Sequence, residues 1–331
     1  MSDYRDFYSN RNVMITGGLG FLGSNLAHTL VELGAKVLLV DPMLPLYGGN
    51  YFNVESIRDL VRVNIADIRD AGAMNELVKG QDVIYHIGNQ TSHVDSMTDP
   101  LLDVDINCRG NIIFLEACRQ FAPEAKIVYA GTRGQYGRLQ YVPVDEKHPS
   151  NPTDVYGINK HAGEQYMFTY GRIYGMPVTS LRINNSYGPR GQMKHGKYGI
   201  LNWFLRLAMD GKPIQVYGEG QQLRDYNYVD DVTDAFLRVA ATEKSNGEAY
   251  NLGSNEHIKF IDLVRRIVAA AGSGSVEQIA WPEDRAAIEI GDYAADIAKI
   301  QTELGWQPTV TLAQGLERTV GFYREHKQHY W

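Results

Sequence analysis

The chain has 331 residues, of which 44% are hydrophobic and 21% are charged, and its formal net charge is −7. This composition is typical of a folded globular protein and excludes a largely disordered chain. The acidic balance argues against nucleic acid or an anionic membrane as a partner. The polar first residues and the lack of a long apolar run predict no signal peptide and no membrane span. Cys108 and Cys118 fall within one predicted helix, so we expect a reducing, cytoplasmic compartment rather than a disulfide framework.

Short β-branched runs alternate with helical periodicity from residue 11 to about residue 181. The predicted strands are Val13–Thr16, Lys36–Val40, Leu60–Asn64, Val83–His86, Lys126–Ala130 and Val178–Ile183. The predicted helices are Gly20–Leu33, Leu101–Phe121 and Asp154–Tyr174. Nearly continuous apolar strands that alternate with helices are typical of a parallel sheet covered on both faces. The fold class is therefore α/β, with a Rossmann-type doubly wound parallel sheet.

The alternation becomes irregular after Ile183, where residues 184–197 are rich in Gly, Asn and basic side chains. The later predicted elements are helices over Leu201–Met209, Ile258–Ala271, Ala295–Leu304 and Thr311–Glu325, and a strand over Asp225–Val229. We expect a first domain of residues 1–183 with returns at about 225–255. Residues 184–224 and 256–331 then form a smaller C-terminal α/β domain, which we expect to bind the substrate.

A glycine-rich turn directly follows the first predicted strand. Gly17-Gly18-Leu19-Gly20-Phe21-Leu22-Gly23, read from Gly18, has the pattern G-x-G-x-x-G between a strand and a helix. Such a turn lets the backbone approach a pyrophosphate at a helix N-terminus, although the glycines alone also fit a plain tight turn. Asp41 ends the next strand, 18 residues after Gly23. A carboxylate there accepts hydrogen bonds from ribose hydroxyls and repels a 2′-phosphate, which favours NAD over NADP.

Asp67 and Ile68 follow the third predicted strand, where a side chain reaches the adenine of such a cofactor. Asp67 also fits the N-cap of a helix over residues 68–78, and the two roles can coexist. A metal is not expected, because the chain around residues 86–96 has no His-x-His or Cys/His cluster.

Tyr156 and Lys160 stand at i and i+4 near the start of a predicted helix, so they share one face. A nearby ammonium favours the phenolate and lowers the pKa of a tyrosine, which can then exchange a proton with an alcohol near neutral pH. Such a pair arises by chance about once in a chain of this composition, so its context decides. Thr132 closes the preceding strand at the carboxyl edge of the sheet, where ligands bind.

With these motifs in place, the sequence resembles the extended short-chain dehydrogenases/reductases, specifically the nucleotide-sugar epimerases and dehydratases. The resemblance covers nearly the whole chain and rests on the blocks Thr16–Gly23, Tyr156–Glu164, Leu181–Arg190, Arg224–Asp231, Tyr250–Gly253 and Leu304–Pro308. It implies NAD as the cofactor and a nucleotide-diphosphate sugar as the substrate. The expected cofactor contacts are Gly17, Gly20, Phe21, Leu22, Gly23, Asp41, Asp67, Ile68, Asn107, Tyr156 and Lys160.

The resemblance also implies catalytic roles. Tyr156 is the general base toward a sugar hydroxyl, Lys160 holds the nicotinamide ribose and lowers the pKa of Tyr156, and Thr132 bonds the same hydroxyl. Asn185 and Arg224 contact the diphosphate, because an arginine fork meets phosphate oxygens in pairs.

Further substrate contacts are expected around these groups. Arg285 is a second diphosphate candidate, with an exposed surface arginine as the alternative. Asn202 and Tyr217 are expected to line the base pocket. Thr91, Ser92 and His93 lie on a loop between cofactor and sugar, although a loop histidine also fits simple solvation.

The residues after Thr132 separate the possible reactions. Dehydratases of this family place Asp-Glu there and decarboxylases a Glu two residues after the threonine, whereas this chain has Arg133 and Gly134. Without a carboxylate on this segment, elimination lacks its acid/base pair, which favours 4-epimerisation through a transient 4-keto sugar. The alternatives are a 2-epimerase for a CDP-sugar, a 4,6-dehydratase, a uronate 4-epimerase or decarboxylase, a reductase and, remotely, a non-catalytic NAD sensor.

Two expectations remain. Arg133 contacts a substituent at C5 or C6 of the sugar, such as a carboxylate, or else forms a surface salt bridge. The helices Leu101–Phe121 and Asp154–Tyr174 carry apolar residues on more than one face, and the resemblance implies a homodimer through a four-helix bundle.

Overall fold

The computed structural model describes residues 4–282 and 289–331. Its main feature is a seven-stranded parallel sheet of order β11-β6-β5-β4-β1-β2-β3. The strands are β1 (Asn12–Thr16), β2 (Lys36–Asp41), β3 (Val61–Ile65), β4 (Val83–His86), β5 (Lys126–Thr132), β6 (Val178–Ile183) and β11 (Ala249–Asn251). The chain runs outward from β1 in one direction and from β4 in the other, so a crevice opens at their carboxyl ends. The expected Rossmann-type sheet is confirmed.

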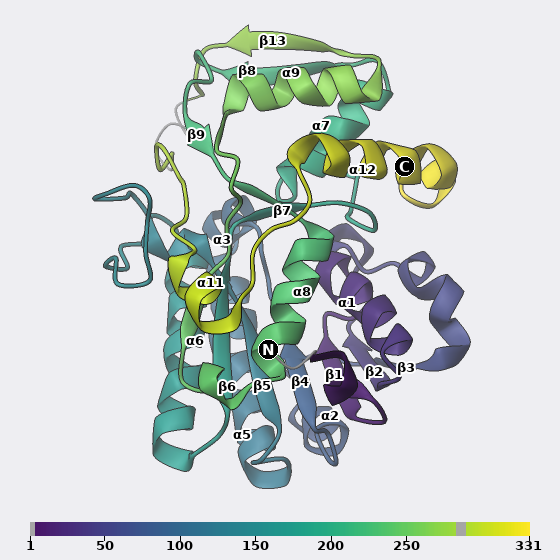
Figure 1. The fold of residues 1–331 in the computed structure, drawn as a ribbon, viewed down its shortest axis with the longest axis vertical. Coiled ribbons are helices and arrows are strands. Elements are labelled where there is room, and N and C mark those ends of the chain that lie inside the picture. Colours follow the sequence, from purple (N-terminus) through teal and green to yellow (C-terminus); the bar gives the residue numbers. More distant parts are fainter. Residues whose placement is uncertain (1–3, 283–288) are drawn as a thin grey trace.

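Helices cover both faces of this sheet (Figure 1). They are α1 (Phe21–Glu32), α2 (Ala71–Leu77), α3 (His93–Thr98), α4 (Pro100–Val104), α5 (Asn111–Phe121), α6 (Val155–Tyr174) and α8 (Val229–Ala240). Successive side chains of a strand point to opposite faces. Val13 and Ile15 of β1 accordingly pack in one core with Phe236 of α8, whereas Met14 packs in another with Phe114 of α5.

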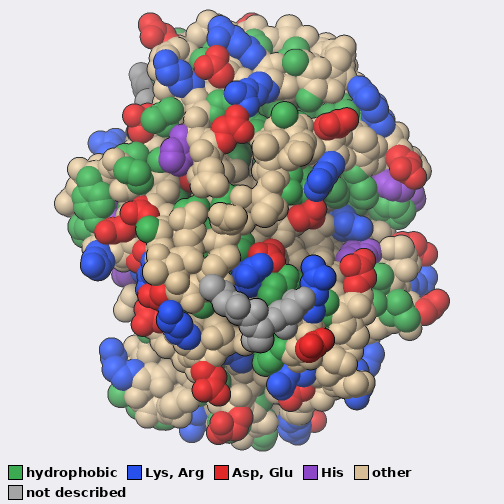
Figure 2. All heavy atoms as spheres, in the orientation of Figure 1, with side chains coloured by type: hydrophobic (Ala, Val, Ile, Leu, Met, Phe, Trp, Pro, Cys, Tyr) green, Lys and Arg blue, Asp and Glu red, His purple; other side chains and the backbone are tan. Residues whose placement is uncertain are grey.

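A third core lies in the upper part of the molecule in Figure 1. Its elements are β8 (Pro213–Tyr217), β13 (Ser275–Ile279), α7 (Ile200–Met209), α9 (Phe260–Ala271) and α12 (Leu312–His326). β8 and β13 pair in parallel, and α7 and α9 pack against them and bury Leu205 and Val264. Helix α11 (Ala298–Leu304) packs beside β11 instead. On the face shown in Figure 2, basic and acidic side chains are interspersed.

Several expected elements differ in detail. The segment expected as one strand at 225–229 forms β9 (Leu223–Arg224) and β10 (Tyr226–Tyr228), which pair with β12 (Ile258–Lys259) and β7 (Asn185–Tyr187) outside the central sheet. The helix expected over 101–121 is α4 and α5, joined by a π-helical turn at Asp105–Gly110. Strand pairing and the formation of a π-helical turn depend on contacts between residues that are far apart in the sequence. Local periodicity does not reveal such contacts.

Candidate active site

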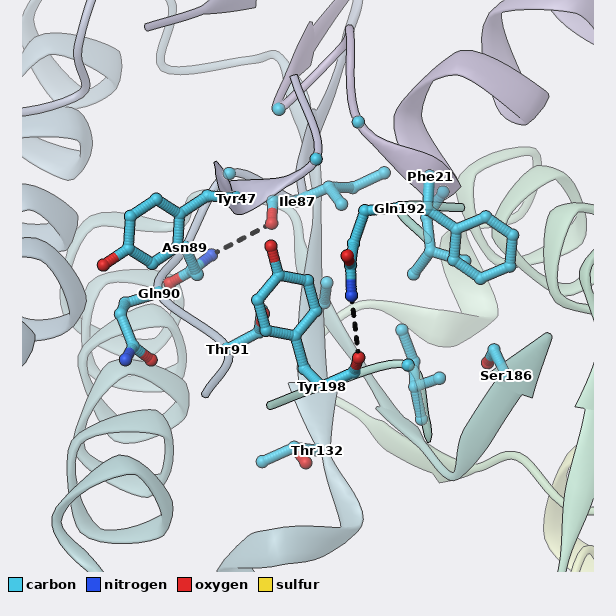
Figure 3. Close-up of a pocket in the computed structure, with 18 of the residues that line it drawn as sticks. Phe21, Tyr47, Ile87, Asn89, Gln90, Thr91, Thr132, Ser186, Gln192 and Tyr198 are labelled. Atoms are coloured by element: carbon cyan, nitrogen blue, oxygen red, sulfur yellow. Dashed lines mark hydrogen bonds between the residues drawn. The ribbon is translucent and has the colours of Figure 1, made fainter. Parts of the chain in front are cut away.

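A cavity of about 530 Å³ opens at the carboxyl ends of β1, β4 and β5. Its wall includes residues from the central sheet, such as Thr132, and residues from beyond residue 183, such as Tyr198 and Asn202. Figure 3 shows Tyr198 and Gln192 in this wall near Ile87 and Asn89. A crevice at the switch point of a doubly wound sheet is the usual ligand site of this architecture.

The glycine turn lies at one end of the cavity, lined by Gly17 and Gly20. Gly17 has a φ of +71°, and a Cβ on Gly23 would lie 2.2 Å from the Gly17 carbonyl oxygen. Both positions therefore require glycine. Gly20 caps α1 without a side-chain hydrogen bond, which leaves the first N–H groups of the helix open to an anion. Phe21 and Leu22 also line the cavity, whereas Gly23 packs behind the turn.

Asp41 is a buried carboxylate at the cavity wall. Its two oxygens accept from the backbone N–H of Leu19 at 3.0 Å and of Met43 at 2.8 Å. Burial raises the pKa of Asp41, and these two hydrogen bonds oppose that rise. The carboxylate is thus held in place by the turn beside it, with further acceptor capacity on each oxygen.

Asp67 and Ile68 line the same wall. The N-cap of α2 is Asp70, not Asp67, so the alternative role expected for Asp67 is wrong. Asp67 pairs with Arg69 at 2.7 Å instead, and although burial acts to raise its pKa, these hydrogen bonds hold the pKa below its usual range. Asn107 is absent from the described cavity wall, because both ends of its amide bond Gln90 on the neighbouring loop.

Thr132, Tyr156 and Lys160 all line the cavity. Asp154 caps α6 by accepting from the Gly157 N–H at 2.7 Å, which places Tyr156 in the first turn. Lys160 donates to the Ala130 carbonyl oxygen at 2.7 Å, and burial lowers the pKa of Lys160 to about 7. The predicted trio therefore lines one cavity, and Thr132 forms a hydrogen bond with Tyr156.

The expected tuning of Tyr156 is not what the structure shows. Burial is the largest influence on this phenol and raises its pKa to about 12, opposed by its hydrogen bond with Thr132. Nearby Asp154 also raises the pKa, while Arg133 lowers it. With a pKa raised by burial to about 12, the phenol stays protonated near neutral pH in the protein alone.

Sequence reasoning missed the partner of His93. The His93 Nδ1 lies 2.5 Å from the second Asp154 carboxylate oxygen, and the His93 ring meets the Tyr156 ring edge-on with centroids 4.7 Å apart. No local signal reveals this pair, because His93 and Asp154 lie 61 positions apart in the sequence. Thr91 lines the cavity beside His93, whereas Ser92 is buried as the N-cap of α3.

The remaining expected substrate contacts divide into two groups. Arg133, Asn185 and Asn202 line the cavity. Arg224 and Tyr217 are absent from the described wall, because Arg224 pairs with Glu289 at 2.6 Å and Tyr217 packs on Trp281. Arg285 lies outside the described residues.

The wall also contains residues that the sequence did not single out. Tyr47, Gln192, Tyr198 and Tyr226 are the main ones. The Leu46 carbonyl oxygen accepts from Tyr198 Oη at 2.7 Å and from His195 Nε2 at 2.8 Å. Lys197 pairs with Asp95 at 2.7 Å. The glycine-rich stretch after residue 184 was the only hint that this segment reaches the site.

Two searches of the described chain found nothing. Residues 4–282 and 289–331 contain no group of three or more His, Cys, Asp or Glu side chains placed to hold a metal ion. In the same ranges, no helix has the length and apolar character needed to cross a membrane.

A parallel sheet of this order, a glycine turn at its switch point and a Thr–Tyr–Lys group at the same edge define the short-chain dehydrogenase/reductase class. The GDP-mannose 4,6 dehydratase family model matches residues 14–319. The chain therefore belongs to this family of extended short-chain enzymes, which includes nucleotide-sugar epimerases and dehydratases, and the resemblance stated from the sequence is confirmed.

Relatives of both kinds match nearly the whole chain. A UDP-glucose 4-epimerase of Mycolicibacterium smegmatis is 32% identical over 95% of this chain and 99% of the relative. An epimerase from Methanothermobacter thermautotrophicus superposes with a TM-score of 0.92 at 26% identity, over 98% of this chain and 96% of that structure. A dTDP-glucose 4,6-dehydratase from Streptomyces venezuelae, solved with NAD bound, has a TM-score of 0.87 at 27% identity, over 96% and 98%.

Proposed function

We propose that the protein is an NAD-dependent nucleotide-sugar epimerase that acts at C4 and retains NAD between turnovers. The observation that carries the choice of epimerase is the pair Arg133-Gly134 directly after Thr132. Elimination of water needs an acid and a base beside the departing hydroxyl, and this segment offers neither. Epimerisation needs only one proton-exchanging group at the C4 hydroxyl, which Tyr156 provides.

The cavity has the features that NAD requires. The open turn at Gly17 and Gly20 fits the pyrophosphate, and the carboxylate of Asp41 fits the adenosine ribose. Asp41 also disfavours a 2′-phosphate, which supports NAD over NADP. NAD, when bound, supplies a reversible hydride acceptor, so that an alcohol can be oxidised and reduced again in one site.

The residues around Tyr156 move and hold the proton. Thr132 and Tyr156 both reach the hydroxyl that loses it, and Tyr156 accepts the proton and later returns it. Because the pKa of Tyr156 is about 12 in the protein alone, base action requires added positive charge in the cavity. The oxidised nicotinamide ring carries such a charge.

The decisive experiment incubates the NAD-loaded protein with UDP-, dTDP-, CDP- and GDP-hexoses without a reductant. Proton NMR then follows the configuration of each sugar carbon. We expect interconversion of two C4 epimers with no net change in NAD. A product that is only the 4-keto-6-deoxy sugar would overturn the epimerase assignment. Inversion at C2 would show that the enzyme epimerises C2 and not C4.

A 4,6-dehydratase is the second candidate, because His93 and Asp154 form an acid–base pair beside Tyr156. A Cβ on Gly134 would lie 3.2 Å from His93 Cε1, so the imidazole fills the space next to residue 134. His93→Gln separates the two functions. It should abolish formation of a 4-keto-6-deoxy product in a dehydratase but spare proton exchange at C4 in an epimerase.

We also propose a homodimer in which α4, α5 and α6 pair with a second copy. Several apolar residues on these helices are exposed, among them Leu101 by 80%, Ile158 by 52% and Ile173 by 63%. Burial of such residues is the usual reason for a helical interface. Light scattering of the full chain at micromolar concentration should give twice the monomer mass, and Ile158→Asp should reduce it to one mass. A monomeric parent protein contradicts the proposal.

A further inference from the structure

Arg133 is only partly buried in the cavity wall, and it differs from the two buried arginines nearby, Arg182 and Arg224. Arg182 pairs with Glu164 at 2.7 Å and Arg224 pairs with Glu289 at 2.6 Å. Arg133 has no ion pair with any carboxylate in the described parts of the chain. Its one hydrogen bond there runs to the Asn185 Oδ1 at 3.3 Å, and its guanidinium carbon lies 4.9 Å from the centre of the Tyr293 ring.

An unbalanced cation in such a place is costly without a ligand. A guanidinium has five N–H donors, and a buried charge is normally paired or fully hydrogen-bonded. Burial and the neighbouring Arg224 lower the pKa of Arg133, which reflects the same cost. Because Arg133 also lines the cavity, its free donors are available to a molecule bound there.

A second observation at the same wall points to a ligand. Tyr226 is 6% exposed and lines the cavity, and its hydroxyl has no hydrogen-bond partner among the described residues. Burial raises the pKa of Tyr226 to about 12, so it remains a neutral donor, although Arg224 and Arg133 lie close enough to oppose the rise. A guanidinium and a phenol hydroxyl on one wall both donate, and a carboxylate accepts from both.

We propose that Arg133 and Tyr226 form a subsite for a carboxylate on the sugar, so that the substrate is an acidic, uronate-type nucleotide sugar. The inference rests on the proposed function, in which Thr132 and Tyr156 hold the C4 hydroxyl. Arg133 directly follows Thr132 in the chain. In a uronate, the C6 carboxylate is bonded to C5, the carbon next to C4. The planar fork of arginine matches the two oxygens of a carboxylate, which makes Arg133 a specificity-determining residue.

The test compares glucose and glucuronate joined to the same nucleotide, with both UDP and dTDP as carriers. We expect the NAD-loaded protein to convert the glucuronate with a kcat/KM at least about 10-fold above that of the glucose. Arg133→Met should lower kcat/KM for the glucuronate by about 100-fold. The loss for the glucose should be at least about 10-fold smaller and reflect only the effect of the Arg133 charge on the pKa of Tyr156. Arg138→Met is the matched control, because Arg138 is exposed after the same segment, and it should change neither value.

The affinity for UDP or dTDP alone, measured by calorimetry, distinguishes a carboxylate contact from the other roles that Arg133 could have. If Arg133 were structural or bound the diphosphate, its replacement would weaken this affinity. Arg133→Met should leave this affinity unchanged, and NAD content and thermal melting should match the parent protein. An equal loss for nucleotide, glucose and glucuronate would overturn the inference and assign Arg133 to the diphosphate. Tyr226→Phe provides a milder second variant, expected to lower kcat/KM for the glucuronate alone by about 10-fold.

Failure of the inference is distinguishable from failure of the proposed function. One result is that the neutral sugar is epimerised with a kcat/KM equal to or above that of the acidic sugar, and that Arg133→Met shows no selective effect. That result overturns the carboxylate subsite but leaves the proposed epimerase activity intact. Absence of epimerisation with every nucleotide sugar overturns the proposed function and the inference together.

Discussion

The two ends of the cavity differ in how far the chain itself satisfies their polar groups. At the glycine-turn end, the hydroxyl of Thr16 and the carboxylate of Asp41 each accept two backbone hydrogen bonds. At the other end, the described chain leaves the Asn184 Oδ1, the Ser186 Oγ and the Tyr226 hydroxyl buried without partners. The Thr16 and Asp41 oxygens at the glycine-turn end already have partners in the chain, whereas the three atoms at the other end acquire partners only when a ligand is present.

This difference separates stability from recognition. A substitution at the glycine-turn end removes bonds that the folded protein already makes, so it should lower the free energy of unfolding. A substitution at the other end removes a polar atom that has no partner in the described chain, so it should change catalysis while stability stays nearly constant. Three of the following four variants test that separation, and Lys126→Met tests the pH dependence of stability away from the cavity; they begin with the largest expected effect.

Tyr156→Phe should lower kcat by about 1000-fold, because the proton acceptor at the C4 hydroxyl is lost. The free energy of unfolding should change by less than about 1 kcal/mol, since the ring remains in place. Stopped assays on the active nucleotide sugar and urea unfolding measure the two effects. Retention of more than a tenth of the activity would remove Tyr156 from the chemistry.

Lys126→Met should alter the pH dependence of stability. The Lys126 ammonium donates to Thr179 Oγ1 at 2.7 Å and to Ser245 Oγ at 2.8 Å, and burial lowers its pKa from 10.5 to about 7. Between these values the unfolded chain binds more protons than the folded protein, so stability rises with pH.

Relative to the variant, the parent protein should therefore gain about 3 kcal/mol of unfolding free energy from pH 7 to pH 10. Urea unfolding of both proteins at four pH values measures this difference. Parallel curves would contradict the depressed pKa.

Thr16→Val should lower the free energy of unfolding by about 2 kcal/mol, because two partly buried backbone N–H groups lose their acceptor and the buried His86 Nδ1 loses its partner. The two N–H groups belong to Ile87 at 3.1 Å and Gly88 at 3.0 Å from the Thr16 hydroxyl oxygen. Valine has nearly the same shape, so packing changes little. A variant as stable as its parent would mean that this end is not completed by its own bonds.

Ser186→Ala is the counterpart at the sugar end. The unpartnered hydroxyl contributes nothing to the folded protein, so the free energy of unfolding should change by less than about 0.5 kcal/mol. KM for the active substrate should rise by about 5-fold if the hydroxyl bonds the ligand. A loss of stability as large as that of Thr16→Val would erase the contrast between the two ends.

Local signals account for what the sequence predicted well. The first strand was expected over 13–16 and is β1, one residue longer, because its apolar β-branched run is bounded by a glycine turn. The motif at 17–23 and the Thr132, Tyr156 and Lys160 group were predicted because each depends on a short spacing or on a strand end.

Long-range contacts account for what the sequence could not predict. Arg224 was expected at the diphosphate, but its partner Glu289 lies 65 positions away. The i, i+4 spacing predicted that Lys160 lies near Tyr156. It did not reveal that the Ala130 carbonyl oxygen would accept a hydrogen bond from the Lys160 ammonium. Cavity residues such as Tyr47 and Tyr198 come from segments that no local pattern joins.

The contacts at the Leu46 carbonyl have a consequence for how the enzyme would respond to its surroundings. They bridge two segments of the cavity wall, and Lys197 and Asp95 add an ion pair beside them. In the proposed function NAD stays bound between turnovers, and a bridge that closes over the dinucleotide would slow its exchange with the free pool. The rate of such an enzyme would follow the supply of its sugar and be insensitive to the ratio of oxidised to reduced dinucleotide in the cell.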